Sequence, residues 1–597
     1  MLQGIERFSR RFDLIIYQKS KYFSAEQAQD NLTGLSPLLV RALRARGAVT
    51  PEQIERFLHP SAEDFHDPFL LPDMDKAVQR IHAALENGER ICIFGDYDVD
   101  GICSTAMLVD YFHSVGADVG YHIPSRREEG YGMSRGAIDK LHSCGVNLII
   151  TVDNGISAAD EISYCSELGI DVIVTDHHIP PETVPKCTAV VCHTVSNSQY
   201  PNSILCGAGI AFKLLHALAG LEAAMQYVSL AGLASVADVV PLLDENRVFV
   251  KLGLDAINSG NCCNGLYRLL NGVLTARRPY NACTLGFAVA PRLNASGRMS
   301  DASLGVELFL CRDPNRADEI IARLNKLNEL RQQDEANILN DAIRRLEPCD
   351  LSDTRAIVLR SETWNAGVIG IAASRIAEMY HRPTILFSES DGILKGSARS
   401  IDGVNIHEVL CCCREFFVRF GGHAKAAGIT MESAFFEDFR LKLNACLKAG
   451  YDDSVFIPCK RYEFDIPLEQ VTRELIAELT RLAPFGESNP SPVFRSRHVA
   501  VSRLRRFGSD AQHTKMDVSP SISSSAAPLD AVWFASAASY YRLLNADTVD
   551  MLYTPGINNW NGFDSIQLRV VSAKAEQPRD IDAYIEKGMR YFCNGLL

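Results

Sequence analysis

The chain has 597 residues, of which 47% are hydrophobic and 22% are charged, values typical of folded globular proteins. At roughly 150 residues per domain, this length predicts three or four domains and excludes a fibrous or wholly disordered chain. The 60 basic and 73 acidic residues give a net charge of −13. That charge disfavours a protein that coats a polyanion, but it permits an enzyme with a local basic channel.

The cysteines and the apolar runs indicate a reducing compartment. None of the 18 cysteines stands in a C-x-x-C pair, and the runs 262–263 and 411–413 fit neither a disulfide framework nor a zinc ribbon. The apolar run 14–17 is too short for a signal-peptide core, and charged residues interrupt the apolar tract 204–225. We therefore expect a cytoplasmic protein that has no contact with a membrane.

The first half of the chain predicts an α/β domain behind a helical extension. Residues 1–75 are expected to be helical, with a capping-box start at residues 50–53. Over residues 76–315, helical patterns alternate with short β-branched runs at 91–94, 148–152 and 172–174. This alternation predicts a doubly wound parallel sheet that helices cover on both faces.

The second half predicts a linking helix and two smaller domains. An apolar stripe through Ile320 and Leu324 predicts a linking helix over 316–348, in which the clearest helical pattern, of about thirty residues, would span roughly 45 Å. A second, smaller α/β domain is expected over 349–450, and short strands over 455–575 predict a β-barrel. Residues 576–597 are left as a C-terminal tail.

Acidic residues and histidines follow three of the predicted parallel strands. Asp96 and Asp98 follow the first strand, Asp153 follows the second, and His177 and His178 follow the third. Because the carboxyl ends of parallel strands share one edge of the sheet, the three loops are expected to converge. Clustered carboxylates repel one another and need cations between them, and carboxylates with imidazole suit Mn²⁺ or Mg²⁺. The loops therefore predict a phosphoester hydrolase with two divalent cations.

A calcium-binding EF-hand is the competing interpretation of the first loop. Asp96, Asp98 and Asp100 have the D-x-D-x-D-G spacing with which an EF-hand loop begins. That loop requires a glutamate at its twelfth position, where this chain has Met107, and a helix before it, where a strand is predicted. The sequence therefore favours the hydrolase.

Five segments resemble the motifs of the DHH phosphoesterase superfamily. They are residues 95–101 (GDYDVDG), 152–155 (VDNG), 176–178 (DHH), 235–241 (SVADVVP) and 421–428 (GGHAKAAG). Within the superfamily, the chain most resembles the RecJ family of bacterial single-stranded-DNA exonucleases. The likeness extends to residues 291–298 (PRLNASGR) and to the PFGxxNPxP segment at 484–492.

The resemblance implies a fold and an activity. It implies a DHH catalytic domain over 76–315, a DHHA1-type substrate-binding domain over 349–450 and an OB-like nucleic-acid-binding domain over 455–575. The implied activity is 5′-to-3′ exonuclease cleavage of single-stranded DNA to mononucleotides, with Mn²⁺ or Mg²⁺, in DNA repair and recombination. Single-stranded DNA, a single-strand-binding protein and a helicase are the partners implied.

The resemblance also implies roles for individual residues. Asp153 would bridge two cations, with Asp96 at one of the two sites, whereas the other site would be completed by Asp98, His177 and Asp238. His178 would lie beside the scissile phosphate. The further substrate contacts expected are Arg126, Arg127, Arg292, Asn294, Arg298, Ser397, Arg399, Gly422 and His423. In the barrel, the candidate contacts are Arg503, Arg505, Arg506, Phe507 and Trp533.

Three positions depart from the family pattern. Phe94 stands where some members carry a metal-binding histidine, which leaves one site with fewer protein ligands. Asn365 replaces the histidine of a Trp-His-x-Gly motif, and Cys192-His193 replaces an Asn-Pro pair. We expect the metal chemistry to survive these changes because the carboxylates remain.

Two other functions stay open on the sequence alone. A DHH phosphodiesterase of short oligonucleotides or cyclic dinucleotides would share the two α/β lobes, but the extension, linking helix and barrel favour a long polymer. A catalytically inactive DHH scaffold could bind single strands without cleaving them. The retained carboxylates argue against such a scaffold, because buried charges are costly without a cation.

Overall fold

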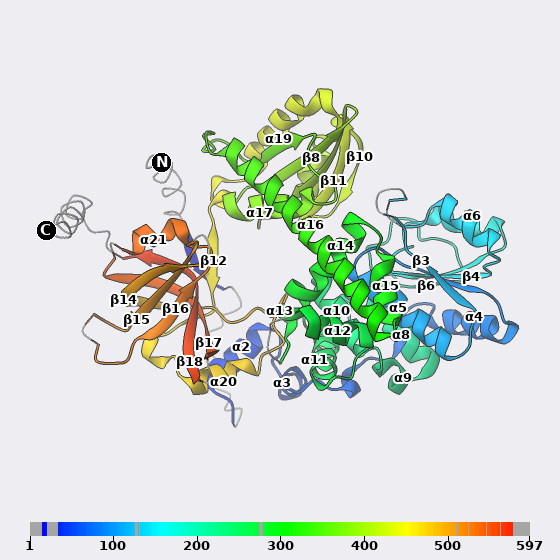
Figure 1. Cartoon of the computed structure of the whole chain (residues 1–597), viewed down its shortest axis with the longest axis horizontal. Helices are drawn as coiled ribbons and strands as arrows, with labels where there is room; N and C mark the ends of the chain where they lie inside the picture. Colours follow the sequence, from blue (N-terminus) through cyan, green and yellow to red (C-terminus); the bar gives the residue numbers. More distant parts are fainter. Residues whose placement is uncertain are drawn as a thin grey trace.

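The structure is a computed structural model that describes residues 15–20, 34–125, 129–130, 132–273, 279–508, 511–522, 524–544, 546–560 and 563–576. Arg126 and Arg127, two of the expected substrate contacts, lie outside these residues. Two α/β lobes are joined by a long helix, and a β-barrel lies beside them (Figure 1). Across the described ranges, every helix is too short or too polar to traverse a bilayer.

A five-stranded parallel sheet forms the centre of the first lobe. In spatial order, its strands are β3 (Val119–His122), β2 (Ile91–Phe94), β4 (Leu148–Val152), β5 (Asp171–Thr175) and β6 (Ala189–Val191). Every residue of β2 and β4 is buried. Burial along the whole strand is what a parallel sheet covered on both faces requires.

Helices cover both faces of this sheet, as the alternating pattern predicted. On one face, Ile91 and Ile93 of β2 share an apolar core with three helices: α4 (Met74–Asn87), α5 (Val99–Ser114) and α8 (Gly207–Ala219). On the other face, Cys92 and Phe94 share a core with α6 (Arg135–Ser143) and α7 (Ala159–Glu167). Successive strand residues point to opposite faces, so β2 contributes to both cores. The predicted doubly wound sheet is confirmed.

Helices complete the first lobe. They are α9 (Leu221–Met225), α10 (Val228–Ala237), α11 (Asp244–Ser259), α12 (Asn264–Val273), α13 (Ala282–Thr284), the π-helix η4 (Leu285–Val289), α14 (Ala290–Met299) and α15 (Ser303–Leu310). Helices α10 and α15 pack against α5. This helical layer therefore supports the helix that follows the first acidic loop.

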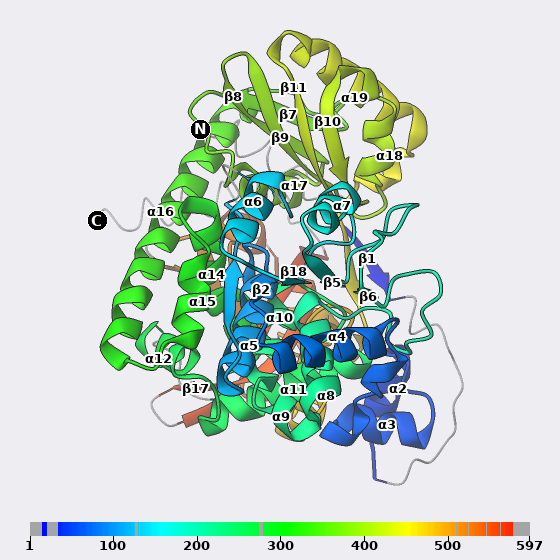
Figure 2. The same ribbon diagram turned by 90° about the vertical axis from the view of Figure 1, so that its right-hand side faces the viewer.

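A single helix, α16 (Pro314–Leu346), connects the two lobes and is 33 residues long. Its N-cap is Asp313, whose side chain accepts a hydrogen bond from the backbone N–H of Asn315 (3.0 Å). At 1.5 Å per residue, the helix is about 50 Å long. It runs along one side of both lobes (Figure 2). The predicted linking helix is thus present, with ends two residues from those expected.

The second lobe contains a mixed five-stranded sheet. In spatial order, its strands are β10 (Phe417–Gly422), β11 (Ala426–Glu432), β9 (Ile393–Arg399), β8 (Thr384–Ser390) and β7 (Ile357–Ser361), and only β7 and β8 are parallel. The helices of this lobe are α17 (Ile369–Tyr380), α18 (Ile406–Cys411) and α19 (Phe436–Gly450). The smaller α/β domain predicted for this part of the chain is confirmed.

The C-terminal part closes into a five-stranded barrel. Its strands, in order around the barrel, are β14 (Phe494–Phe507), β15 (His513–Ser519), β16 (Leu529–Trp533), β18 (Phe563–Ala575) and β17 (Thr548–Trp560), which pairs with β14. A short strand, β13 (Phe464–Asp465), extends the sheet beside β14. Helix α20 (Arg473–Thr480) precedes the barrel, and α21 (Ala537–Leu543) lies between β16 and β17. The predicted β-barrel is confirmed.

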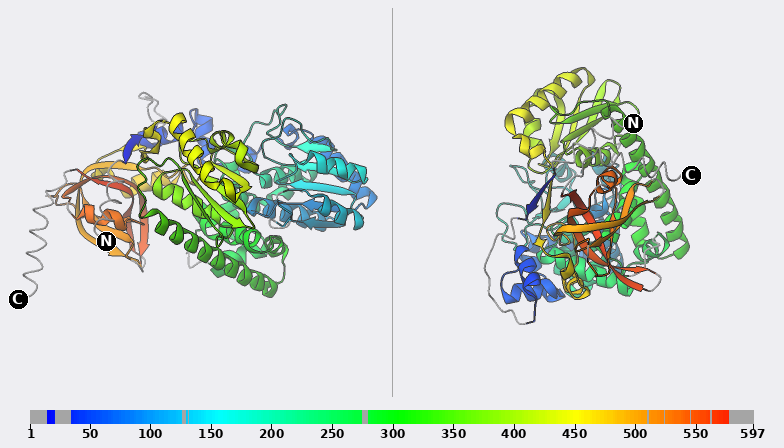
Figure 3. Two further views of the ribbon diagram at one scale, coloured as in Figure 1. Left: turned by 90° about the horizontal axis from the view of Figure 1, so that it is seen from above. Right: turned by 90° about the vertical axis from the view of Figure 1, so that its left-hand side faces the viewer.

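The N-terminal extension packs against the barrel and not only against the first lobe. Helices α2 (Pro37–Ala45) and α3 (Pro51–Leu58) share an apolar core with the barrel and α20, and strand β1 (Ile16–Lys19) pairs with β12 (Cys459–Tyr462) (Figure 3). The capping box expected at α3 is present, between Thr50 and Gln53. Segments more than 400 residues apart in the sequence thus form one unit.

Candidate metal centre and nucleic-acid interface

The three acidic loops converge at the carboxyl ends of β2, β4 and β5, as predicted. One group of carboxylates, Asp96, Asp98 and Asp153, has ligand atoms within 4.8 Å of one another. A second group around Asp153 contains Asp176, His177 and His178 at the same spacing. Asp153 therefore lies at the centre of the site, in contact with both the first and the third loop.

The backbone at Asp153 is held in an uncommon conformation. Its φ is 61°, in the left-handed region, and the following turn contains Gly155 with a φ of 108°. Two hydrogen bonds fix this turn: Thr151 Oγ1 donates to the carbonyl of Asn154 (2.7 Å), and Asn154 Nδ2 donates to the carbonyl of Phe94 (3.2 Å). Such strain persists where the surrounding structure over-determines it, which is common at functional sites.

Asp98 is the N-cap of α5. Its Oδ1 accepts hydrogen bonds from the backbone N–H groups of Asp100 (2.9 Å) and Gly101 (3.2 Å). Its carboxylate has ligand atoms within 4.8 Å of those of Asp96 and Asp153. The placement of Asp98 with His177 and Asp238 at one cation, which the resemblance implies, stays a prediction.

Asp100 lies in the group that contains His177 and Asp238. His177 has three carboxylates around it: its Nε2 is 3.1 Å from Asp153 Oδ1 and 3.8 Å from Asp100 Oδ2, and its Nδ1 is 3.8 Å from Asp238 Oδ2. Asp100 also accepts hydrogen bonds from the backbone of Gly207 (2.6 Å) and Ala208 (2.7 Å) at the start of α8. The sequence analysis gave this residue no role at the site, although it is the third aspartate of the D-x-D-x-D run.

Asp176 orients the two histidines of the third loop. Its Oδ1 accepts hydrogen bonds from the backbone N–H of His177 (2.7 Å) and from both the backbone N–H (3.1 Å) and the Nδ1 (2.7 Å) of His178, while its Oδ2 accepts one from Ile156 (2.9 Å). Burial opposes the charged form of His178, but the hydrogen bond and the charge of Asp176 outweigh burial and raise its pKa to about 9. His178 Nδ1 is thus occupied, and its Nε2 is directed away from Asp176.

The carboxylates repel one another strongly. Burial and the neighbouring carboxylates raise the pKa of Asp153 well above its usual value, and they raise that of Asp100 as well. Burial, with Asp100 and Asp98 nearby, raises the pKa of Asp238 to about 8. A cation would relieve this repulsion. Five carboxylates with one imidazole, that of His177, form the oxygen-rich donor set that Mn²⁺ and Mg²⁺ take, so the residues fit two such ions.

Phe94 gives the site no ligand. Its side chain is fully buried in the core formed with α6 and α7, and its ring lies 4.9 Å from that of His122 on the neighbouring strand. His122 is itself paired with Glu129, at 3.0 Å. The position where some relatives carry histidine is therefore part of the apolar core here.

Helix α14 contacts the first acidic loop. Asn294 Oδ1 accepts a hydrogen bond from the backbone N–H of Val99 at the start of α5 (3.2 Å), and a Cβ on Gly297 would come within 2.3 Å of the carbonyl of Tyr97. The two arginines expected to bind DNA from this helix contact protein groups. Arg292 donates to the carbonyl of Ala288 and to the side chain of Asn325, and Arg298 donates to the carbonyl of Gly367 in the second lobe (3.1 Å).

The second-lobe candidates lie on two neighbouring strands and the adjoining turn. Arg399 Nη1 donates to Ser397 Oγ (2.8 Å) on β9, next to the start of α17. Gly422 has a φ of 151°, and a Cβ there would come within 2.4 Å of the carbonyl of Ala426, so this turn requires glycine. His423 follows it in the exposed β10–β11 turn. Asn365, the departure from the family pattern, donates to Asp334 on α16 (3.0 Å).

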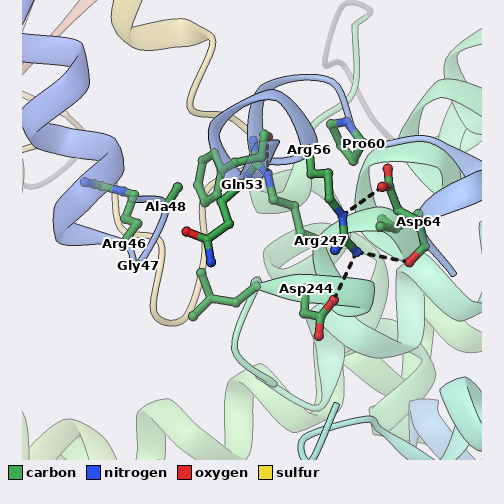
Figure 4. A pocket seen from close by; sticks show the side chains of 12 residues that line it. Arg46, Gly47, Ala48, Gln53, Arg56, Pro60, Asp64, Asp244 and Arg247 are labelled. Carbon is green, nitrogen blue, oxygen red and sulfur yellow. Dashed lines mark hydrogen bonds and ion pairs between the residues drawn. The ribbon is translucent and has the colours of Figure 1, made fainter. Parts of the chain in front are cut away.

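A cavity of about 270 Å³ lies where the extension, the first lobe and the segment before the barrel meet (Figure 4). Each arginine around it is paired: Arg46 with Glu463 and Asn489, Arg56 with Asp64 and Asp244, and Arg247 with carbonyl groups of residues 57 and 482–484. These bonds explain why Asn489 belongs to the motif at residues 484–492. The cavity is a structural junction.

The barrel carries a cluster of aromatic and basic side chains that the sequence identified only in part. Phe507, His513 and Phe534 lie with ring centroids 5.1–6.2 Å apart, and Arg569 lies over Phe534. Arg506 lies over Tyr540 and Tyr541. Trp533, by contrast, packs against the barrel core. Only the folded barrel brings its strands and α21 together, so sequence spacing could not reveal the cluster.

Comparisons with known proteins agree with this architecture. Three family models match: the DHH family, N-terminal domain (residues 90–237), the DHHA1 domain (353–449) and the RecJ OB domain (462–572).

The chain is 37% identical over 545 residues to the single-stranded-DNA-specific exonuclease RecJ of Bacillus subtilis, covering 91% of this chain and 68% of that protein. It is 33% identical over 566 residues to RecJ of Escherichia coli K12, covering 91% and 96%. The structure of Thermus thermophilus RecJ with Mn²⁺ matches with a TM-score of 0.76 and 29% identity, covering 95% of this chain and 80% of that one. The chain belongs to the RecJ family of DHH-domain proteins.

Proposed function

We propose that this protein is a metal-dependent exonuclease that degrades single-stranded DNA from its 5′ end to mononucleotides, in DNA repair and recombination. The observation that carries the proposal is the cluster of buried carboxylates around Asp153 at the carboxyl edge of the sheet. Membership of a family whose curated relatives are named single-stranded-DNA-specific exonucleases supports the substrate. The 5′-to-3′ direction rests on the family resemblance alone.

Two divalent cations, Mn²⁺ or Mg²⁺, are the cofactors we assign. Asp96, Asp98 and Asp153 would hold one, and Asp153, together with Asp100, His177 and Asp238, would hold the other. When bound, such cations polarise a phosphodiester and activate water. The protein's contribution is to fix these ligands before the substrate arrives, through the α5 N-cap, the α8 N-terminus and the turn at Asp153.

His178 is assigned to the phosphate. Asp176 holds its Nδ1, and we assign its Nε2 to donate a hydrogen bond to a phosphate oxygen or to the leaving oxygen. The raised pKa keeps that proton on the ring at neutral pH. Asp176 itself acts through His178 and is a positioning residue.

The bound DNA strand would run from the barrel to the first lobe. The loop at residues 486–487 meets the segment after Asp238, since Leu242 donates to the carbonyl of Glu487 (2.9 Å). We propose that the barrel cluster binds the distal part of the strand, while Asn294, Arg298, Ser397, Arg399, Gly422 and His423 shape the path near the metals. Arg292 would contribute indirectly, through α14. These features favour a long polymer over a dinucleotide.

A single-strand-binding protein and a helicase are the partners that the family resemblance supports. A cytoplasmic location fits the free thiols of the 17 cysteines that the structure describes.

The decisive experiment is digestion of single-stranded DNA, labelled at either end and with or without a 5′ phosphate, in the presence of Mn²⁺. Wild type should release mononucleotides from the 5′ end, and Asp153→Asn should not. Asp160→Asn, an exposed aspartate on α7, is the matched control and should behave as wild type. Cleavage of dinucleotides but not of long strands would favour the short-oligonucleotide phosphodiesterase. Binding of strands without any cleavage would favour the inactive scaffold.

A further inference from the structure

Three exposed apolar side chains lie on segments that carry or contact residues of the carboxylate cluster. They are Ile179, which follows His178, Val239, which follows Asp238, and Phe287 of the π-helix η4, which packs against α10. Their exposed fractions are 73%, 63% and 82%. Large apolar side chains this exposed, beside residues that carry chemistry, indicate a surface that a ligand covers.

Phe287 lies next to the element that carries Asp238. A Cβ on Gly286 would come within 3.2 Å of Val236 Cγ1, and Val236 precedes Asp238 by two residues. The η4 turn that holds Phe287 also packs against α10, whose C-cap is Asp238. The turn that carries Phe287 is thus anchored against the helix that ends at Asp238.

The backbone around Phe287 is fixed although its ring is free. Leu285 and Val289, at the two ends of the π turn, are buried, and Arg292 ties the carbonyl of Ala288 to Asn325 on α16. Single π turns are rare in proteins, and those that occur are often found at functional sites. Val239 is β-branched yet has a φ of 58°, a strained conformation of the kind that is retained where a site needs it.

We propose that Phe287 is a stacking platform for a nucleobase next to the scissile phosphodiester. This inference rests on the proposed function. A phosphodiester bound at the cluster leaves its bases at the border of the site, and the turn that carries this exposed ring packs against the helix that ends at Asp238. Stacking on an aromatic ring accepts any base, as an exonuclease that reads no sequence requires. In a duplex the bases are already stacked and paired, so the contact also favours a single strand.

Steady-state kinetics of the full chain with Mn²⁺ would test the platform. Phe287→Ala should raise the KM for single-stranded DNA about 10-fold, within the range for losing one stacked base, and leave kcat within about 2-fold. Phe287→Trp should restore the KM. Val115→Ala is the control, because Val115 is also exposed but follows the far end of α5, about 24 Å away along the helix.

Oligonucleotides with one abasic position separate stacking from a structural role. As the abasic site is moved stepwise away from the cleaved end, the kcat/KM of wild type should fall about 10-fold at one position. Phe287→Ala should lose nothing more at that position, because the contact is already absent. The stacking assignment would be overturned if Phe287→Ala had the same reduction in kcat/KM, relative to wild type, on intact and on all abasic strands. It would also be overturned if the variant had no reduction on any strand.

Binding without cleavage distinguishes this inference from the proposed function. Fluorescence anisotropy of the same oligonucleotides in EDTA measures the contact even if the protein hydrolyses nothing. If wild type bound strands but cleaved none, the proposed function would fail while the same position-dependent loss would still support stacking. If cleavage were normal and Phe287→Ala bound intact and abasic strands as wild type does, only the stacking inference would fail.

Discussion

The acid cluster of the first lobe and the aromatic-basic face of the barrel hold their side chains in opposite ways. Asp100, Asp153 and Asp176 are buried and fixed by backbone N–H groups or by a strained turn. Phe534 and Tyr541, on the barrel, are about half exposed and contact neighbouring rings and arginines. Catalytic groups tolerate little displacement, so the fold holds them rigidly. Exposed side chains that can adjust their positions are enough to bind a polymer of variable sequence.

The largest effect should follow a change at Asp100, which lies in the group that contains His177 and Asp238. Asp100→Asn should lower kcat with Mn²⁺ by more than about 100-fold, because the group that contains His177 loses a negative charge. Exonuclease rates measured across a Mn²⁺ titration check this. Wild-type rates in the variant would show that Asp100 only caps α8.

A change at Asp176, which acts through its contact with His178, should have a smaller effect. Asp176→Asn should lower kcat by about 10- to 100-fold, the range for residues that orient a site from outside it. It should also move the pH–rate profile toward acid, since the pKa of His178 falls when Asp176 loses its charge. An unchanged profile with a reduced rate would mean that Asp176 only supports the loop.

The pH dependence of metal binding should report the repulsion in the cluster. Asp238 has its pKa raised to about 8, so it carries a proton at neutral pH in the metal-free protein and must release it to bind a cation. The affinity for Mn²⁺ should rise about 10-fold per pH unit between pH 6 and 7 for each proton displaced. Calorimetry in buffers of different ionisation enthalpy counts the protons.

The raised pKa of Asp238 also predicts the direction in which the stability of the metal-free protein changes with pH. The folded pKa of Asp238 lies above its unfolded value of about 3.9, so its contribution to stability is present at low pH and is lost as pH rises toward 8. The Tm without metal should therefore fall between pH 5 and 8 relative to the Tm with Mn²⁺. Parallel curves would contradict the assignment of Asp238 to the cation.

The smallest effect is expected on the barrel. Phe534→Ala should raise the KM for a long single strand about 5-fold, as expected for weakening one stacking contact, and should leave cleavage of a short oligonucleotide unchanged. Phe563→Ala, an exposed phenylalanine at the start of β18, is the matched control. Equal losses on long and short substrates would place Phe534 outside the strand path.

Much of the site could be predicted because it depends on local patterns. Buried β-branched runs fixed the parallel strands, and the residues after them had to meet at one edge, which brings Asp96, Asp153 and His177 together. Spacing does not reveal which aspartate of a D-x-D-x-D run caps the helix and which one faces His177, so it gave Asp100 no role at the site.

Other features depend on long-range packing that no motif carries. The contact of Arg292 with Asn325 exists only because α14 packs on α16, and Phe287 lies on a π turn that no sequence motif marks. The joint core of the N-terminal helices and the barrel likewise requires the folded chain.

The most direct test of the account is the number of Mn²⁺ ions that one chain binds, measured by calorimetry on wild type and on Asp153→Asn. Asparagine tolerates the left-handed backbone at this position, so the variant should remain folded. Wild type should bind two ions, and the variant should bind both much more weakly, because Asp153 lies between the two groups. One ion in wild type, or two equally tight ions in Asp153→Asn, would contradict the assignment of a bridging carboxylate.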